Sequence, residues 1–475
     1  MPERTVDRKA RMKIPHTPYP ERPPEERVHD FGEVAIGYDA ETARLEASRC
    51  LHCPEAHCSK ACPLHNDISE AMWLIEEGDF IAAANVYRRT SPFPEFCGRV
   101  CPQERLCEGV CPHGKRGDAP SLGKLEMFVA DYQRKTQGWP IPEIAARTGH
   151  RVAVVGAGPA GIAAAESLAR RGHAVTVFEA ARAGGGLLMY GIPNFKLDKT
   201  LVQSKIDMLQ RLGVEFVFET RVGKDVTVDA LVAQGFDAVF LGVGANVDAP
   251  LKAQGVDLKG VYQAGEYLLR TNPPKAIVPE NLREVPVVGK RVAVIGGGDT
   301  ATDCLRTSLR LGAENVVCYY RRTEAEMPGS KKERHHAIEE GARVEYLVAP
   351  VRFFGDENGH LRAMELQRME LGEPDKSGRR RPVPIAGSEF TVDVDTVVLA
   401  LGYWPDDTVG KGTPGLETHD YGLITADAQS GSTSRPGVFA GGDAVTGPDL
   451  VSTAVAAGFR AAEAIDRYLA SLDAK

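Results

Sequence analysis

The stretch RVAVVGAGPAGIAAAESLARRGHAVTVFEA occupies residues 151–180 and decides the fold of the chain. It begins with an apolar run that predicts a buried strand, continues as a helix and ends in a second strand. Gly156, Gly158 and Gly161 stand at the turn between the first strand and the helix. This spacing is typical of a dinucleotide-binding turn, in which glycines permit a tight bend and bring backbone close to a pyrophosphate. The helix N-terminus also offers free N–H groups to the phosphates.

An acidic residue follows this turn at the distance that the fingerprint requires. Glu179 ends the second strand, 23 residues after Gly156, where a carboxylate can accept hydrogen bonds from ribose hydroxyls. Pro159 and Ala160 open the helix beside the expected phosphates. All four parts of the fingerprint, the strand, the turn, the helix and the acid, stand in the required order and spacing. This favours a dinucleotide site over a glycine turn used only for packing. The sequence therefore predicts a dinucleotide site at this first turn.

A second unit of the same kind opens with the strand RVAVIG. Its turn has Gly296 and Gly298 at the first two positions and Ala301 at the third, where the pattern allows alanine. Asp299 and Thr300 begin the helix that follows. Two copies of strand, glycine turn, helix and strand predict two dinucleotide sites in one chain.

The second unit carries arginines where the first carries an acid. Arg321 and Arg322 follow two tyrosines at the end of its second strand. An acid at this point would repel a 2′-phosphate, whereas a guanidinium can bind one. The sequence therefore favours NADPH over NADH at the second site. The alternative interpretation is that these arginines belong to a solvated strand end.

A third signal lies near the C-terminus, where Gly442 and Asp443 follow a short apolar strand and precede a helical run over residues 450–464. An aspartate after a glycine pair at a strand end can bind a ribityl hydroxyl, and the helix can face a flavin ring. The pattern resembles the second FAD motif of two-dinucleotide flavoprotein reductases. Residues 396–405 (TVVLALGYWP) likewise resemble the return crossing of these enzymes from the NADPH domain to the FAD domain.

Eight of the ten cysteines lie between residues 50 and 111. They form the runs Cys50-x2-Cys53-x4-Cys58-x3-Cys62-Pro63 and Cys97-x3-Cys101-Pro102-x5-Cys107-x3-Cys111-Pro112. Short spacings with proline after a cysteine are typical of iron–sulfur ligation, because short loops direct several sulfurs at one cluster. Structural zinc is the alternative, since Cys50-x2-Cys53 fits a zinc knuckle, but eight thiols fit two [4Fe–4S] clusters better. The chain is therefore expected to transfer single electrons.

Composition narrows the class of protein. The chain has 475 residues, 43% of them apolar and 26% charged, which suggests about two to four domains. Its net charge of −8 with both signs interspersed argues against nucleic-acid binding. A charged, proline-rich N-terminus and the absence of a long apolar run predict neither a secretory signal nor a membrane helix, hence a cytoplasmic protein. Cys304 and Cys318 are expected to be small buried thiols, too far apart to form a redox pair.

These signals predict an α/β chain in which an N-terminal α-helical iron–sulfur domain precedes two Rossmann-like dinucleotide-binding domains. Residues 1–40, rich in proline and charge, are expected to form an extended arm, and residues 41–145 the helical iron–sulfur domain. The FAD domain is expected over 146–285 and 398–475. The NADPH domain is expected over 286–397.

The order of cysteine block, FAD motif and NADPH motif resembles the small (β) subunit of bacterial glutamate synthase over nearly the whole chain. The resemblance rests on the stretches CGRVCPQERLCEG at 97–109, GGLLMYGIPNFKL at 185–197, GGGDTATDC at 296–304, YRR at 320–322 and MPGS at 327–330. The same module is similar to the N-terminal half of dihydropyrimidine dehydrogenase and to the large subunit of the bifurcating ferredoxin:NADP transhydrogenase.

The resemblance implies a set of cluster ligands that spacing alone does not give. One [4Fe–4S] cluster would be held by Cys50, Cys53, Cys58 and Cys111, and the second by Cys62, Cys101, Cys107 and Glu126. A last cysteine that leaves its own run for the other cluster is known in ferredoxins. In the simpler alternative each cluster has four cysteines, so that Cys97 is a ligand and Glu126 lies on a helix surface.

The resemblance also implies a function. NADPH would reduce FAD by hydride transfer, with Gly186 and Leu187 beside the flavin, and the clusters would carry single electrons to an acceptor. The cofactors carry this chemistry, so no catalytic acid or base of the protein is expected. In glutamate synthase the acceptor lies on a large (alpha) subunit, which makes glutamate from glutamine and 2-oxoglutarate. The arm and the cysteine domain are the expected contact surfaces of that hetero-oligomer.

Two other functions stay open at this point. The chain resembles modules that serve other pathways, as an NADPH/ferredoxin oxidoreductase or a transhydrogenase subunit. A function of another class is a redox-sensing or structural iron–sulfur interaction module, whose clusters NADPH would not reduce.

Overall fold

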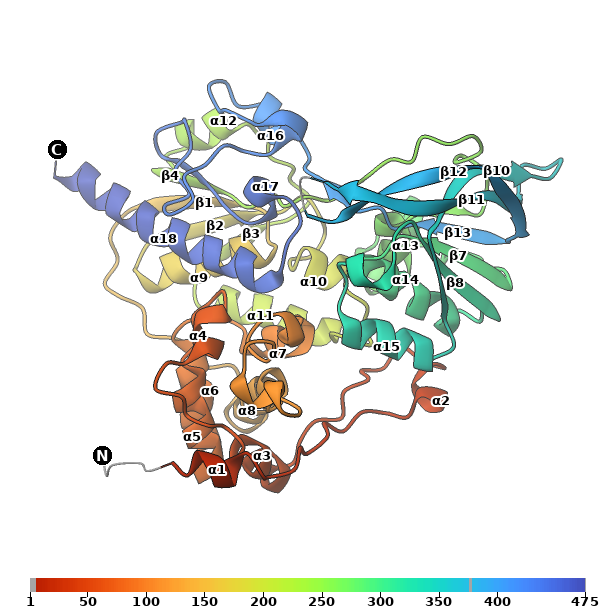
Figure 1. Cartoon of the computed structure of the whole chain (residues 1–475). Coiled ribbons are helices and arrows are strands. Elements are labelled where there is room, and N and C mark those ends of the chain that lie inside the picture. The colour runs from red at the N-terminus through yellow and green to blue at the C-terminus, as the bar shows by residue number, and fades with distance from the viewer. Residues whose placement is uncertain (1–5, 376–377, 475) are drawn as a thin grey trace.

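The computed structural model describes residues 6–375 and 378–474 and divides them into a helical domain and two domains built on parallel sheets (Figure 1). The helical domain lies below the first sheet domain in this view, and the second sheet domain lies beside both. None of the described helices combines the length and the apolar character that a membrane crossing requires. The predicted α/β class with a helical N-terminal domain is confirmed.

The helical domain is a bundle of short helices around the cysteine loops. Its main helices are α3 (Ala40–Ala47), α5 (Ile68–Glu77), α6 (Phe80–Arg88), α7 (Pro94–Val100) and α8 (Leu122–Gln137), and the loops add α4 (His57–Ala61), η1 (Gln103–Arg105) and η2 (Pro112–Lys115). Asp67 and Asp79 cap α5 and α6 through their side chains, and Gly78 between the helices adopts a left-handed conformation. These caps explain why two helices, rather than one, form over this apolar stretch.

The first parallel sheet has the strand order β15-β4-β1-β2-β3. Its strands are β1 (Arg151–Val155), β2 (Ala174–Phe178), β3 (Glu215–Val217), β4 (Ala238–Leu241) and β15 (Val438–Ala440). Helix α9 (Pro159–Arg170) follows the first glycine turn and packs against the long C-terminal helix α18 (Val451–Asp473). The two helices approach so closely that a Cβ at Gly458 would stand 2.2 Å from the carbonyl oxygen of Ala160.

The second parallel sheet has the order β6-β13-β7-β8-β9. Its strands are β6 (Val261–Gln263), β7 (Arg291–Ile295), β8 (Asn315–Tyr320), β9 (Arg343–Tyr346) and β13 (Thr396–Leu399), with helices α13 (Ala264–Thr271), α14 (Asp299–Arg310) and α15 (Lys331–Glu339). The sequence analysis placed the start of this domain at residue 286. Because β6 pairs with β13, the sheet also includes residues before that point. The sequence missed β6 because it is a three-residue strand with no glycine turn after it.

An antiparallel sheet that the sequence did not predict extends from the second domain. Its strands are β10 (Val348–Gly355), β11 (Leu361–Pro374) and β12 (Arg380–Asp393). The short strands β5 (Val247–Asp248) and β14 (Tyr403–Trp404) pair where the chain crosses between the two parallel-sheet domains. The remaining helices are α10 (Leu187–Tyr190), α11 (Lys199–Arg211), α12 (Val228–Ala233), α16 (Thr408–Lys411), α17 (Asp443–Thr446), η3 (Lys275–Ile277), η4 (Glu280–Leu282) and η6 (Asp420–Gly422), and η5 (Glu324–Glu326) lies before α15.

The predicted arm lies along the chain's own domains. Its described part contains α1 (Arg8–Arg11) and α2 (Pro24–Arg27), and Figure 1 shows it running from the helical domain to α15. Val34 N–H donates to the carbonyl oxygen of Phe195 at 2.9 Å in the first sheet domain. Arg27 Nε donates to Glu340 Oε1 at 2.8 Å in the second. The arm therefore joins all three domains.

Candidate functional site

A cavity of about 880 Å³ opens at the carboxyl ends of the first sheet, the position at which open α/β sheets bind their ligands. Eight of the ten residues predicted for FAD line it: Gly156, Gly158, Pro159, Ala160, Glu179, Gly186, Leu187 and Asp443. The other two, Gly161 and Gly442, are not among its lining residues. The cavity volume falls within the range of protein cofactor sites.

The glycines of this cavity leave no room for side chains. A Cβ at Gly161 would stand 1.9 Å from the carbonyl oxygen of Gly156, so helix and turn pack at backbone distance. Gly186 has a φ of +53°, and a Cβ there would stand 2.8 Å from the Cα of Gly158. A side chain at either position would displace the backbone of the turn that forms the cradle.

Two carboxylates of the cavity are held at defined places. Glu179 accepts hydrogen bonds from the N–H groups of Ala157 and Ala181, both at 2.8 Å. Burial raises the pKa of Glu179, although these two bonds favour its charged form. Burial also raises the pKa of Asp443 to about 6. A buried carboxyl that can accept or donate suits hydrogen bonding to sugar or polyol hydroxyls.

The second glycine turn has a tight interior and an open outer side. A Cβ at Gly296 would stand 2.1 Å from the carbonyl oxygen of Ala400, whereas a Cβ at Gly298 would meet nothing within 4 Å. Ala301 is buried at the third position. Asp299 begins α14 and accepts a hydrogen bond from Ser330 N–H at 2.8 Å. The open backbone at Gly298 is where a pyrophosphate can approach.

The two arginines predicted to bind a 2′-phosphate have different environments. Arg321 is exposed, and its side chain makes no hydrogen bond or ion pair with any residue that the structure describes. Arg322 is 5% exposed; its Nε donates to the carbonyl oxygen of Arg380 at 2.7 Å and its Nη2 contacts Asp375 at 2.8 Å. Arg322 is thus engaged with the tip of the β11–β12 hairpin, and Arg321 is the guanidinium available to an anion.

Tyr403 connects the two dinucleotide sites. It lines the large cavity from the crossing strand β14. Burial raises the pKa of its hydroxyl, while a hydrogen bond with Thr300 at the start of α14 lowers it. The second turn therefore adjoins the first cavity. Sequence motifs did not reveal Tyr403, nor the other residues that the crossing adds to the lining, among them Asn246, Asp248 and Leu282.

The first cysteine group surrounds a small cavity. Cys50, Cys53, Cys58 and Cys111 line a space of about 30 Å³, the four residues that the family resemblance implied for one cluster. Burial raises the pKa of Cys50 to about 12. A thiol held in this way becomes a thiolate only beside a positive charge, which cluster iron would supply. The residues present therefore fit a cluster.

The arm supports the loop of this first group. Arg11 Nη1 donates to the carbonyl oxygens of Ser48 and Cys50, at 2.6 and 3.1 Å. Arg8 donates to the carbonyl oxygens of Leu51 and His52, both at 3.1 Å. Two cationic side chains thus bind four of the five backbone carbonyl oxygens from residue 48 to residue 52, around Cys50.

The second cysteine group lies between α8 and the first sheet domain. Burial and the Glu126 carboxylate raise the pKa of Cys62 to about 11, and Glu126 also raises the pKa values of Cys97 and Cys107. Glu126 accepts a hydrogen bond from Asn66 at 3.4 Å and does not lie on an outer helix surface. A hydrogen bond from Cys97 lowers the pKa of Cys101. Both candidates for the fourth ligand, Glu126 and Cys97, therefore face this group.

The second group also borders the large cavity. Cys62 and Cys101 pack against the buried core of the first sheet domain, and α7, which precedes Cys101, contacts α18. Leu450 and Val451, at the start of α18, line the cavity.

Comparisons with known proteins agree with this division of the chain. Residues 27–138 match the family model described as dihydropyrimidine dehydrogenase domain II, 4Fe-4S cluster, and residues 150–458 match the pyridine nucleotide-disulphide oxidoreductase model. The glutamate synthase [NADPH] small chain of Escherichia coli is 40% identical over 95% of this chain and 96% of its own length. AegA of Escherichia coli, an oxidoreductase assigned only provisionally, is 44% identical over 94% of this chain and 68% of its own length.

A solved structure shares the fold of the two sheet domains. FprA of Mycobacterium tuberculosis in complex with NADPH matches with a TM-score of 0.58 over 68% of this chain and 86% of its own. The two sequences are 20% identical. Such a likeness supports the arrangement of the domains as a fold and carries no assignment of residues.

Proposed function

The chain belongs to the family of the glutamate synthase NADPH small chain, a family of NADPH-dependent oxidoreductases, and we propose that it is the electron-input subunit of a glutamate synthase. In this role it oxidises NADPH and delivers the electrons to a large partner subunit, which makes glutamate from glutamine and 2-oxoglutarate. When bound, NADPH, FAD and two [4Fe–4S] clusters supply hydride and single-electron transfer. The residues of this chain hold these groups in a fixed order.

The large cavity is the proposed FAD site. The backbone at Gly156 and Gly158 and the start of α9 bind the pyrophosphate, and Glu179 binds ribose hydroxyls. Asp443 binds the ribityl chain, and Gly186 with Leu187 borders the flavin ring. The backbone contacts at 1.9 and 2.8 Å that a Cβ at Gly161 or Gly186 would make support this use, because they describe a cradle without side chains.

The second turn is the proposed NADPH site. Gly296, Gly298, Asp299 and Thr300 form the pyrophosphate turn, and Arg321 binds the 2′-phosphate. Arg322 fixes the end of β8 next to Arg321 through its own contacts with the β11–β12 hairpin. Tyr403 lies between this turn and the flavin cavity, so the nicotinamide end of NADPH has a route to the flavin.

The cysteines are the proposed cluster ligands. Cys50, Cys53, Cys58 and Cys111 hold one cluster, and Cys62, Cys101, Cys107 and Glu126 hold the other. The second group would receive electrons from the flavin, and the first group would pass them outward. The single observation that supports this order is the packing of Cys62 and Cys101 against the core of the first sheet domain, where α7 contacts α18 and the first turn of α18 lines the FAD cavity.

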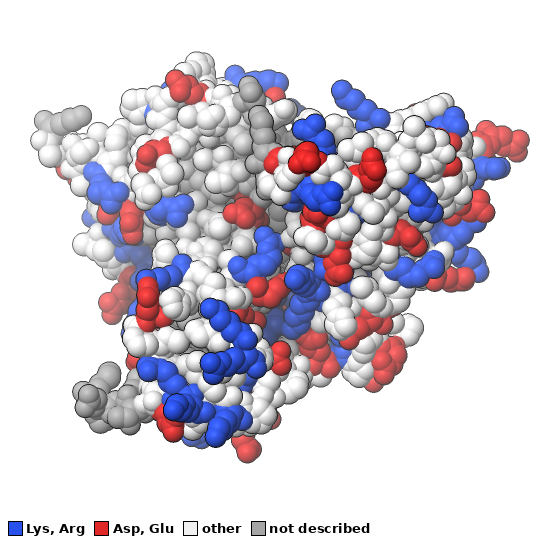
Figure 2. Space-filling model, viewed as in Figure 1, with Lys and Arg blue, Asp and Glu red and all other residues white. Residues whose placement is uncertain are grey.

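The partner contacts the helical domain near the first cysteine group. Lys and Arg side chains gather on this part of the surface in Figure 2, and α1 contributes Arg8, Lys9 and Arg11 to it. A basic face favours an acidic face on the partner and accelerates their association at low salt.

Anaerobic purification of the tagged chain from its native cell tests this function. A large co-purifying subunit, together with NADPH oxidation that depends on glutamine and 2-oxoglutarate, is the expected result. A different companion, or glutamine-independent transfer of electrons to it, would refute glutamate synthase and leave the NADPH-dependent oxidoreductase.

One observation favours a second candidate. AegA, an oxidoreductase without an established reaction, is as similar to this chain as the glutamate synthase small chains are. The second candidate is therefore the input module of an oxidoreductase with another electron acceptor. Equal rates of NADPH-dependent dye reduction with and without the glutamate synthase large subunit's substrates would favour it.

A further inference from the structure

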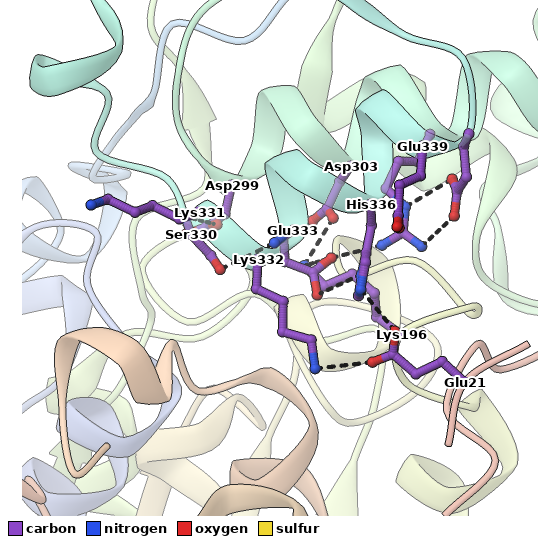
Figure 3. Close-up of polar contacts among 12 residues, drawn as sticks. Glu21, Lys196, Asp299, Asp303, Ser330, Lys331, Lys332, Glu333, His336 and Glu339 are labelled. Atoms are coloured by element: carbon purple, nitrogen blue, oxygen red, sulfur yellow. Dashed lines mark hydrogen bonds and ion pairs between the residues drawn. The ribbon is translucent and has the colours of Figure 1, made fainter. Parts of the chain in front are cut away.

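A short segment of the second sheet domain packs on the second glycine turn. It comprises residues 327–330, the MPGS motif of the sequence. Gly329 N–H donates to the carbonyl oxygen of Gly297 at 3.2 Å, and a Cβ at Gly329 would stand 3.0 Å from the carbonyl carbon of Gly298. Ser330 N–H donates to Asp299 Oδ1 at 2.8 Å, and Figure 3 shows these two residues together. The segment therefore fixes the backbone and the first carboxylate of the NADPH-binding turn.

The other side of this segment contacts the cysteine domain. The Ser330 hydroxyl donates to Glu104 Oε1 at 2.7 Å, and Lys331 N–H donates to the same oxygen at 3.2 Å. Arg105 Nη1 donates to the carbonyl oxygen of Pro328 at 2.6 Å. Glu104 and Arg105 belong to η1, which lies between Cys101 and Cys107. One chain of hydrogen bonds thus joins the nucleotide turn to the loop of the second cysteine group.

Helix α15, which follows the segment, is held by buried charges from the first sheet domain and from α14. Lys196 Nζ contacts Asp303 Oδ1 at 2.9 Å and Glu333 Oε2 at 3.7 Å (Figure 3). Arg306 Nη1, on α14, contacts Glu333 Oε2 at 2.7 Å. The side chains of Lys196 and Asp303 are 11% and 8% exposed. Separating a buried ion pair of this kind costs free energy, because it leaves an unpaired charge in a poorly solvated environment. The segment therefore has a rigid support behind it.

From these contacts we propose that Glu104 is a positioning residue for NADPH binding and couples occupancy of the nucleotide turn to the loop of the second cluster. The proposal rests on the NADPH and cluster sites proposed above. It assigns a role in the nucleotide site to a side chain from the cysteine domain.

The physical reason lies in the charge of Asp299. Its carboxylate stands at the start of α14, where the nucleotide phosphates approach, and it would repel them if it turned toward them. The hydrogen bond from Ser330 N–H keeps the Asp299 carboxylate turned away from the phosphates. Glu104 in turn fixes Ser330 by accepting a charge-assisted hydrogen bond from its hydroxyl at the N-terminus of α15, where a negative charge is favoured. Without Glu104 this restraint loosens, so nucleotide binds more weakly. By linkage, nucleotide binding then acts on the Cys101–Cys107 loop to the same extent.

The first experiment titrates NADP⁺ calorimetrically into the cofactor-loaded protein. Glu104→Ala is expected to weaken NADP⁺ binding about tenfold, which corresponds to about 1.4 kcal/mol. Glu104→Gln retains an oxygen that can accept from Ser330 and should recover part of this loss. Glu55→Ala is the matched control, because Glu55 also lies in a cysteine loop but pairs only with exposed Lys60 on its own domain. An unchanged dissociation constant in Glu104→Ala would overturn the positioning role.

The second experiment measures the coupling itself. The reduction potential of the second cluster is determined by a spectroscopic redox titration with and without saturating NADP⁺. In the wild type and in Glu55→Ala the nucleotide should shift this potential, and in Glu104→Ala the shift should disappear. A shift that persists in Glu104→Ala at saturating nucleotide would overturn the coupling, whereas a merely structural role for Glu104 would leave it intact.

Two outcomes separate this proposal from the function on which it rests. If the wild-type protein does not bind NADP⁺, the proposed NADPH site fails first.

If Glu104→Ala does not retain its iron, Arg105→Ala tests the same link, since the Arg105 side chain is exposed and reaches Pro328. The Arg105→Ala protein should bind NADP⁺ about two- to threefold more weakly than the wild type, as expected for the loss of one hydrogen bond. A dissociation constant equal to that of the wild type would overturn the proposal.

Discussion

The choice between NADPH and NADH should depend on one arginine of the pair. Arg321 is exposed and has no partner among the described side chains, whereas Arg322 is buried and bonded to Asp375 and Arg380. Partial burial and the neighbouring Arg322 lower the pKa of Arg321 despite the attraction of Asp375. An anion such as the 2′-phosphate is therefore bound best by Arg321. We predict that Arg321→Ala removes most of the preference for NADPH.

The expected size of this effect follows from the exposure of Arg321. A hydrogen bond to a charged group contributes about 1.5–3 kcal/mol, and an exposed site lies at or below the lower end because water and salt screen it. A loss of about 1.4 kcal/mol corresponds to a tenfold fall in kcat/KM for NADPH. NADH lacks the phosphate, so its kcat/KM should stay within about twofold of the wild-type value. The ratio of the two constants should therefore fall about tenfold.

Arg322→Ala is the matched variant for this measurement. Initial rates with NADPH and NADH, using a dye as electron acceptor, give the ratio for each protein. Loss of Arg322 should lower the thermal stability of the protein, because its two bonds to the β11–β12 hairpin are internal, and should change the ratio by less than about threefold. A larger fall in the ratio for Arg322→Ala than for Arg321→Ala would refute the assignment.

Three further predictions concern the clusters, the FAD site and the buried charges. Glu126→Gln should alter the electron paramagnetic resonance spectrum of one cluster while Cys97→Ser does not; the reverse result would make Cys97 the ligand. Gly161→Ala should abolish FAD binding, measured as flavin absorbance per chain, because its Cβ would stand 1.9 Å from a carbonyl oxygen, whereas Ala301→Gly should leave NADP⁺ binding within about threefold. The Glu340 side chain is buried against Arg27, Arg306 and Arg310; burial alone would raise its pKa, but Arg306 and Arg310 outweigh burial and lower the pKa to about 2, so its carboxylate should contribute about 3 kcal/mol of stability above pH 4.5, lost as the pH falls toward 2. Glu340→Gln should therefore lower the thermal unfolding temperature at pH 7 by several degrees and by less at pH 4; an equal loss at both pH values would contradict this reasoning.

The sequence predicted the elements whose signals are local. The strand and helix that flank Gly156, and the equivalent pair around Gly296, follow from apolar runs and glycine spacing within about thirty residues. Local chemistry also identified five residues of the large cavity, since the phosphate turn and the acid after it are encoded within one strand–helix–strand unit: Gly156, Gly158, Pro159, Ala160 and Glu179. Gly186 and Leu187 were implied by the family resemblance, and Asp443 by the C-terminal motif.

The sequence failed where a residue's environment is set by a distant segment. The partners of Arg322 stand 53 and 58 residues further along the chain, in a hairpin that has no motif of its own. His336 lies in the charged run KKERHHAIEE, whose composition favours a solvated face, yet it is buried, and Glu21 of the arm contacts its Nε2 at 2.9 Å. Neither contact leaves a periodic signal, because each depends on one pair of side chains brought together by the whole fold.

The arm gives the clearest case in which structure changes an expectation. Its proline and charge content is that of a segment without its own core, which fits a segment that follows other surfaces. The surfaces are those of this chain: Arg27 contacts Glu340, and Asn194 Nδ2 donates to the carbonyl oxygen of Phe31 at 2.9 Å. Removal of the arm should therefore weaken the junction between domains, not only contact with a partner.

The position of the two cysteine groups argues for the direction of electron flow and for the site of the acceptor. The second group packs against the core of the first sheet domain, which holds the FAD cavity, and the first group adjoins α1, whose Arg8 and Arg11 bind the backbone around Cys50. If the first group is the exit, electrons that enter at the flavin would cross the helical domain before they leave the chain. A partner that docks on the basic surface of α1 would then contact the same helix that fixes the loop of the exit cluster. Docking and electron delivery would be linked through that loop, because any shift of α1 changes the hydrogen bonds and charge around Cys50.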